Sequence, residues 1–235
     1  MTADIKVGGF TPFTTIDFPN HIACVVFMQG CPWKCPYCHN PALIPFDSIE
    51  SNVSWEEILA FLDTRVNLLE GVVFSGGEPI AQKGLKNAIE EVRKKGFFVA
   101  LHTNGYNPEV IEEILPLLSW VGLDIKLPFS KYNKRIGKGA DGNKVAASLA
   151  AVIKSGMKFE VRTTLDPRII RKVDVLEIAE MLAQNGVENY ALQQYRCGEN
   201  ERNVPTIPEI LQFFNDEEFL SKLRALIPNV ILRAE

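Results

Sequence analysis

The sequence contains no apolar segment that approaches the roughly 20 residues needed to cross a lipid bilayer. It also lacks internal repeats and low-complexity tracts, so neither a solenoid nor a disordered chain is indicated. The net charge is only −4 over 235 residues, which is unlike a protein that neutralises nucleic-acid phosphates. With 46% apolar and 23% charged residues, the composition is that of a globular protein. We therefore expect neither a membrane nor a nucleic acid as partner.

Cysteine is scarce, but three of the five cysteines lie within the segment Cys31–Cys38. Such clustering favours a metal site in a reducing compartment over a disulfide framework. The segment Met1–Lys6 shows no charged stretch followed by an apolar one, as a secretory signal has, so we expect a cytoplasmic protein. Cys24 lies in an apolar run and is expected to be a core residue, and Cys197 is taken as incidental.

The spacing of Cys31, Cys35 and Cys38 is C-x3-C-x2-C, directly after the apolar run Ile22–Met28, which predicts a buried strand. Four thiolates close a [4Fe–4S] cluster, so three leave one iron open to a non-protein ligand. An open metal position is typical of catalytic sites rather than structural ones.

Three other interpretations of these cysteines stay open. The pair Cys35 and Cys38 followed by His39 matches a haem-attachment motif, which leaves Cys31 unexplained. The same pair could be a thioredoxin-like redox motif, which needs no third cysteine. The three cysteines with His39 could form a zinc site, although the neighbouring residues Cys38 and His39 would have difficulty in binding the same tetrahedral ion.

Strand and helix patterns alternate from residue 21 to 195, which predicts an α/β protein with a parallel sheet and helices outside it. We expect one domain over residues 1–235, with an N-terminal extension 1–20, a core 21–195 and a helical tail 196–235. In the extension, Ile5–Phe18 predicts a short strand, a turn at Thr11-Pro12 and a return. Helices are expected over 81–95 and 208–226, among others, and Val230–Leu232 is expected to be a final short strand.

Polar motifs follow several of the expected strands, at the edge where parallel α/β folds bind ligands. They are Gly76-Gly77-Glu78-Pro79, then Thr103-Asn104-Gly105, then Asp124 with Lys126, and Arg162. Glycines allow a ligand to approach the backbone closely, and Glu78 offers a carboxylate to an ammonium group. The alternatives are ordinary turns for the first two motifs and a plain ion pair for Asp124 and Lys126. An inward Arg162 requires an anionic partner.

The C-x3-C-x2-C spacing, with the aromatic Tyr37 before its last cysteine, resembles the signature of the radical S-adenosylmethionine (SAM) enzymes. The longer segments Gly8–Pro19 and Phe27–Pro41 resemble the activating proteins of anaerobic ribonucleoside-triphosphate reductase, a branch of the glycyl-radical-enzyme activases. The resemblance is strong up to Pro79, moderate up to Lys126 and thin beyond it. It implies a partial (β/α)6 TIM-like barrel, open on one side.

The resemblance also implies the cofactors and the residues that bind them. One [4Fe–4S] cluster is expected on Cys31, Cys35 and Cys38. SAM is expected to contact Tyr37, Gly76, Gly77, Glu78, Pro79, Thr103, Asn104, Asp124, Lys126 and, more weakly, Arg162. Some relatives have an acidic cation ligand where His102 stands, so His102 is expected to be a packed or solvated residue. The basic segment Lys131–Lys138 is expected to be a solvated face or to help dock a partner.

The function implied is reductive cleavage of SAM to a 5′-deoxyadenosyl radical, which takes a hydrogen atom from a glycine of the reductase. A flavodoxin- or ferredoxin-like protein would supply the electron, and the chain has no additional ferredoxin-like cysteine clusters. Three alternatives stay open. They are another glycyl-radical enzyme such as pyruvate formate-lyase, a small substrate such as a deazapurine precursor, and a structural metal-binding module.

Overall fold

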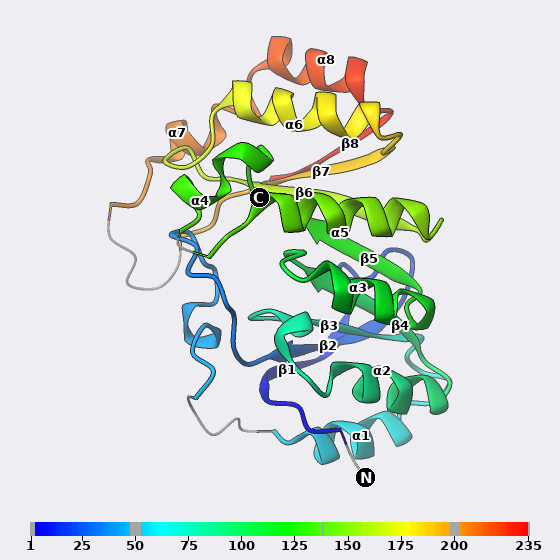
Figure 1. The fold of residues 1–235 in the computed structure, drawn as a ribbon. Helices are drawn as coiled ribbons and strands as arrows, with labels where there is room; N and C mark the ends of the chain where they lie inside the picture. The colour runs from blue at the N-terminus through cyan, green and yellow to red at the C-terminus, as the bar shows by residue number, and fades with distance from the viewer. Residues whose placement is uncertain (1–2, 48–52, 138, 198–202, 235) are drawn as a thin grey trace.

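The computed structural model describes residues 3–47, 53–137, 139–197 and 203–234. One eight-stranded sheet contains all the strands of these ranges, in the order β1-β2-β3-β4-β5-β6-β7-β8 (Figure 1). Strands β2 to β8 run parallel, and β1 is antiparallel to β2. The strands are β1 Val7–Thr14, β2 Ala23–Met28, β3 Gly71–Gly76, β4 Phe98–Thr103, β5 Trp120–Asp124, β6 Phe159–Leu165, β7 Asn189–Gln194 and β8 Asn229–Arg233.

Helices connect the parallel strands, because such strands cannot be joined by tight turns. They are α1 Trp55–Asp63, α2 Leu85–Lys94, α3 Pro108–Ile114, α4 Tyr132–Arg135, α5 Gly142–Lys154, α6 Lys172–Gln184, α7 Ile207–Leu211 and α8 Glu217–Leu226. Short 3-10 turns occupy Pro41–Leu43, Pro79–Ala81, Leu115–Leu117 and Phe129–Lys131. Within the described ranges, no helix combines the length and the apolar character that a membrane span requires.

The two faces of the sheet have different surroundings. The outward side chains of the strands pack with the helices into the main apolar core. On the concave face a small separate cluster fills one end, made of Phe18, Ala23, Val25, Val73, Ala100 and Trp120. Beyond this cluster, β5, β6 and β8 carry charged side chains that pair across the strands, Arg162 with Asp124 and Arg233 with Glu160. The predicted open α/β partial barrel is confirmed, because β1 and β8 end the sheet without pairing to each other.

The prediction for the N-terminal segment was wrong. Residues 7–14 form one continuous strand through Thr11-Pro12, with a register shift between Thr11 and Thr14 where it pairs with β2. Proline is tolerated here because β1 is an edge strand, where a missing N–H costs no hydrogen bond of the sheet.

Two predicted helices are shorter than expected. The first starts at Leu85 rather than 81, because Pro79–Ala81 forms a separate 3-10 turn. The stretch 208–226 is divided into α7 and α8. The final strand was predicted over Val230–Leu232 and is confirmed as β8, which adds a parallel strand beside β7.

Candidate active site at the carboxyl ends of the strands

The cysteine loop follows β2 and is fastened to the segment after it. The Gly30 amide donates to the Leu43 carbonyl at 2.8 Å, and the Cys31 amide donates to the Ile44 carbonyl at 2.9 Å. The buried Gln29 side chain donates to the Pro45 carbonyl at 2.6 Å. These bonds satisfy polar groups that no sheet partner reaches, so the loop has a fixed path.

Cys31, Cys35 and Cys38 all line one cavity of about 440 Å³. Burial, reinforced by the charge of Glu78, raises the pKa of the Cys31 thiol to about 12. Burial also raises the pKa of Cys35 and of Cys38. The metal-free thiols are therefore protonated at neutral pH, and metal binding must release their protons.

The arrangement of the thiols separates two interpretations of the loop. Among the described residues, no three His, Cys, Asp or Glu side chains come close enough together to hold a single metal ion. A tetrahedral zinc site requires such convergence. In a [4Fe–4S] cluster each cysteine binds a different iron, so the thiols need only face one cavity, as they do here. His39, the fourth ligand of the zinc interpretation, is exposed and lines the same cavity.

Glu78 joins the motifs that end β3 and β4. Its Oε1 accepts from the Thr103 hydroxyl at 2.6 Å and from the Ile80 amide at 3.3 Å, and its Oε2 accepts from the Asn104 amide at 2.8 Å. Burial raises its pKa to about 7 despite these donors. A carboxylate has about four acceptor positions, so one remains for a cation in the cavity. A positive ligand group there would favour the ionised form.

The two glycines of this motif lie very close to other backbone atoms of the chain. A Cβ on Gly77 would lie 2.5 Å from the Gly30 carbonyl oxygen and 2.6 Å from the Leu43 oxygen. A Cβ on Gly76, where φ is +110°, would lie 2.3 Å from the Met28 nitrogen. Both glycines therefore make room for the backbone of the cysteine loop and its flanks. The approach of a ligand to the same glycines, which also line the cavity, stays a prediction.

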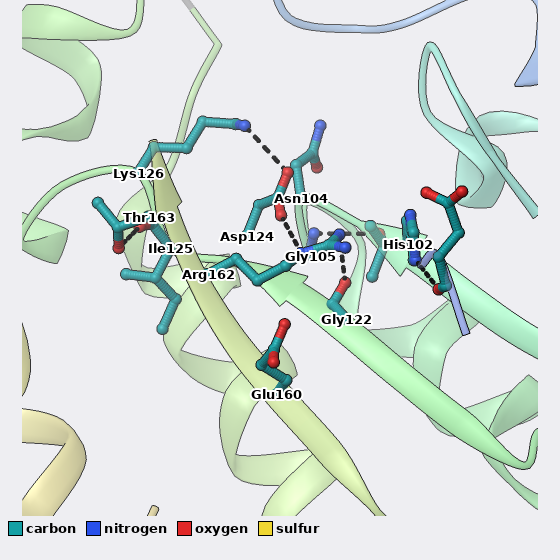
Figure 2. Close-up of polar contacts among 12 residues, drawn as sticks. His102, Asn104, Gly105, Gly122, Asp124, Ile125, Lys126, Glu160, Arg162 and Thr163 are labelled. Atoms are coloured by element: carbon teal, nitrogen blue, oxygen red, sulfur yellow. Dashed lines mark hydrogen bonds and ion pairs between the residues drawn. The ribbon is translucent and has the colours of Figure 1, made fainter. Parts of the chain in front are cut away.

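Asp124, Lys126 and Arg162 form a charged triad in which Arg162 is buried and the other two are half-buried (Figure 2). Arg162 Nε donates to Asp124 Oδ1 at 3.0 Å, and its Nη2 donates to the Gly122 carbonyl at 3.3 Å. Lys126 Nζ donates to Asp124 Oδ2 at 3.3 Å. Burial alone would raise the pKa of Asp124, but the charges of Arg162 and Lys126 outweigh it and lower this pKa. The anionic partner required by Arg162 is thus Asp124 of the same chain.

Tyr37 is buried beside the triad. The ring centroid lies 5.8 Å from Lys126 Nζ. Its hydroxyl is the one buried side-chain oxygen or nitrogen without a hydrogen-bond partner among the residues the structure describes. An orphaned buried hydroxyl is costly unless a ligand or water completes it. This group therefore fits a cavity that receives a polar ligand.

The segment after β5 packs behind the site, and the solvated face predicted for it is found only in part, since Lys134 is exposed. Lys131 and Arg135 do not form a solvated face, because their side chains bind the fully buried carboxylate of Asp174 at 2.8 and 2.9 Å. The segment that they anchor carries Tyr132, whose hydroxyl accepts from the Lys126 amide at 2.9 Å. The ring of Tyr132 also packs edge-on against Trp33 of the cysteine loop, with centroids 5.8 Å apart. Lys138, which ended the predicted segment, lies outside the described residues.

All the predicted site residues except Pro79 line the same cavity. Pro79 is buried and starts a 3-10 turn. Sequence reasoning missed Asp17, Trp120, Thr164 and Arg233, which also line it. Alternation along β6 would have placed Thr164 on the face of Arg162. Arg233 gives no such signal alone, since its position follows from the pairing of β8 with β7.

His102 lies on the cavity wall and is packed, as predicted. Its Nε2 donates to the Asp17 carbonyl at 2.8 Å, and its ring meets Trp120 edge-on with centroids 5.7 Å apart. Burial, followed by the charge of Arg162, lowers the pKa of His102 from 6.5 to about 3.

This pKa predicts an acid-sensitive step in stability. A group whose pKa is lowered by folding stabilises the protein fully above pH 6.5, and this contribution is lost as the pH falls toward 3. We expect the metal-free wild type to lose about 2 kcal/mol more than His102→Gln between pH 7 and 5 in urea denaturation. The comparison cancels the other groups that titrate. Equal losses in both proteins would contradict a neutral, buried His102.

Comparison with known proteins bears directly on this site. The sequence model of the Radical SAM superfamily matches residues 25–182. The chain therefore belongs to the radical SAM superfamily. This radical SAM protein is 32% identical to the "Putative glycyl-radical enzyme activating enzyme" of Methanocaldococcus jannaschii, over 97% of this chain and 95% of that relative. It is 31% identical to the pyruvate formate-lyase-activating enzyme of Clostridium pasteurianum, over 77% of each chain.

Solved structures show the same radical SAM fold. SuiB of Streptococcus suis bound to its precursor peptide SuiA matches with a TM-score of 0.70 and 15% identity, covering 89% of this chain and 48% of that one. QueE from Escherichia coli matches with a TM-score of 0.59 and 18% identity, covering 98% and 94% of the two chains. These identities support the fold alone. Membership in the superfamily implies a [4Fe–4S] cluster and SAM, and the three cysteines that such a cluster requires are present.

Proposed function

We propose that this radical SAM enzyme is a glycyl-radical-enzyme activase whose partner is an anaerobic ribonucleoside-triphosphate reductase. The observation that carries the activase proposal is the 32% identity over 97% of the chain to a relative named for that activity. The reductase rather than pyruvate formate-lyase is proposed because the segments Gly8–Pro19 and Phe27–Pro41 resemble reductase activases. We also propose that the described sheet and its helices are one functional unit.

The residues of the cavity suit this function. In the proposal Cys31, Cys35 and Cys38 hold the cluster, because they face one cavity and leave one iron without a protein ligand. When bound, the cluster and SAM supply the 5′-deoxyadenosyl radical that abstracts a hydrogen atom from glycine. A flavodoxin- or ferredoxin-like donor would provide the electron.

The SAM contacts are assigned from charge and from unfilled hydrogen-bonding positions. Glu78 has an acceptor position left for the ammonium group of SAM and is held in place by Thr103 and Asn104. Lys126 and Arg162 offer positive charge to its carboxylate. The Tyr37 hydroxyl can take a further polar contact. In the proposal Gly76, Gly77 and Pro79 support these contacts by holding Glu78 against the cysteine loop.

A protein substrate also suits the openness of the sheet. The cavity is lined by side chains from β3 to β8, including Arg233 of β8, so it reaches the unpaired edge of the sheet at β8. A folded partner can present a loop at such an opening. A small substrate, in contrast, is usually enclosed.

The test is anaerobic reconstitution with iron and sulfide, reduction with dithionite, and addition of SAM. We expect formation of 5′-deoxyadenosine and, with anaerobic reductase added, a glycyl radical visible by electron paramagnetic resonance. A reductase with alanine at its radical glycine is the matched control and should give no signal. A glycyl radical that forms on pyruvate formate-lyase and not on the reductase would identify pyruvate formate-lyase as the partner instead. No nucleoside under any reductant would reject the proposal.

A further inference from the structure

We infer that Lys126 is a fixed positive charge that makes the cluster easier to reduce, in addition to any contact it makes with SAM. The inference rests on the proposed function, because it requires a cluster on Cys31, Cys35 and Cys38. It assigns to Lys126 a role that is measurable when no SAM is present.

The first observation is the position of the Lys126 ammonium group. It lies 5.8 Å from the ring centroid of Tyr37, the residue directly before Cys38 in the cysteine loop. Lys126 and the three cysteines line the same cavity.

The second observation is that Lys126 cannot move its charge away easily. Its ammonium group binds Asp124, which is itself held by Arg162 Nε at 3.0 Å. Its backbone amide donates to the hydroxyl of the fully buried Tyr132. Because Lys126 is held at both its backbone and its ammonium group, its charge acts on the cavity without the entropy cost of ordering the side chain.

The third observation is the sign and burial of the triad. Two cations and one carboxylate leave a net charge of +1. The side chains of Lys126 and Arg162 are 14% and 8% exposed, so solvent screens them weakly. An opposing group in the same cavity is Glu78, whose carboxyl is held by Thr103 and Asn104. Burial raises the pKa of Glu78 to about 7, so its negative charge is only partly present at neutral pH.

The consequence follows from charge balance. Reduction adds one electron from a one-electron donor to the cluster and no bond is formed or broken, so the cluster gains one negative charge. A positive charge nearby stabilises the reduced state more than the oxidised state. Removing Lys126 should therefore shift the one-electron midpoint potential to a more negative value.

The test is a redox titration of reconstituted protein without SAM, followed by electron paramagnetic resonance of the reduced cluster. For Lys126→Met we expect the equilibrium constant for reduction to fall about tenfold, which is about 59 mV for a one-electron couple. Lys126→Arg keeps the charge and should stay near wild type. Lys134→Met removes an exposed lysine of the neighbouring α4 and is the matched control.

Asp124→Asn gives the decisive comparison, because it removes a negative charge from the same triad. We expect its potential to move in the positive direction, opposite to Lys126→Met. A general disturbance of the site would move both variants the same way, and that result would overturn the inference. A wild-type potential in Lys126→Met would also overturn it. If Lys126→Met holds no cluster, the sign of the Asp124→Asn shift decides alone.

The same measurement separates this inference from the proposed function. A wild-type protein that binds no iron and sulfide would overturn both. A normal cluster with a potential that does not depend on Lys126 would overturn only the role assigned to Lys126.

Discussion

Replacing Cys35 with alanine is expected to abolish cluster binding and the formation of 5′-deoxyadenosine. Cys35 is the central thiol of the loop, and a cluster with only two protein ligands has lost a third of its protein bonds. We expect iron and sulfide content after reconstitution to fall to background, together with the absorbance of the cluster. Far-ultraviolet circular dichroism should stay that of the wild type, because the Cys35 side chain is half-buried at the edge of the core.

Cys24→Ala and Cys197→Ser are the matched controls for this prediction. Cys24 lies in β2, fully buried within the main core, and burial raises its thiol pKa to about 12. Its replacement should cost about 1 kcal/mol of stability through a small cavity and leave iron content unchanged. Cys197 is exposed. Wild-type iron content in Cys35→Ala, or loss of iron in either control, would show that the cluster is held by a different set of thiols.

Gly77→Ala should separate the cysteine loop from β3. The added Cβ would lie 2.5 Å from the Gly30 carbonyl oxygen and 2.6 Å from the Leu43 oxygen, and both are backbone atoms that cannot rotate away. The loop must then shift, which breaks the hydrogen bond from the Glu78 amide to the Gly30 carbonyl at 2.9 Å. We expect a loss of about 1–3 kcal/mol in urea denaturation of the metal-free protein, typical of overpacking. The affinity for the cluster should fall as well, by about 5- to 150-fold if the same strain opposes binding, and iron content after reconstitution should fall with it.

Gly9→Ala is the control, because the same substitution is made there at a glycine that has room for a Cβ. Both glycines have ordinary backbone angles for an L-residue, but a Cβ on Gly9 would meet nothing closer than 3.8 Å. Gly9→Ala should therefore match the wild type in stability and iron content. Similar behaviour of the two variants would mean that the loop adapts to the methyl group. The packing role assigned to Gly77 would then be rejected.

Much of this architecture could be predicted from local sequence, because local rules set it. The run Ile22–Met28 predicts a buried strand, and Ser54 with Glu57 predicts the capping box that starts α1. The cavity residues could be predicted as a group because parallel strands bring their carboxyl ends to one edge.

What could not be predicted depends on contacts between distant segments. The strand–turn–return prediction for residues 5–18 failed because pairing with β2 overrides the turn preference of Thr11-Pro12. Nothing near Lys131 in the sequence indicates that its partner is Asp174, in a helix beyond the next strand. The packing of Gly77 against Gly30 likewise is evident only from the three-dimensional arrangement of the two loops that contain them.

The order of strands in space follows the order of strands along the chain. Each new strand therefore finds its neighbour already present as the chain emerges from the ribosome, and no strand must be inserted between two earlier ones. A chain synthesised through Lys126 carries the three thiols, Glu78 and two members of the charged triad, and of that triad it lacks only Arg162. The strands that line the cavity are thus synthesised in their spatial order, with β8 and Arg233 last.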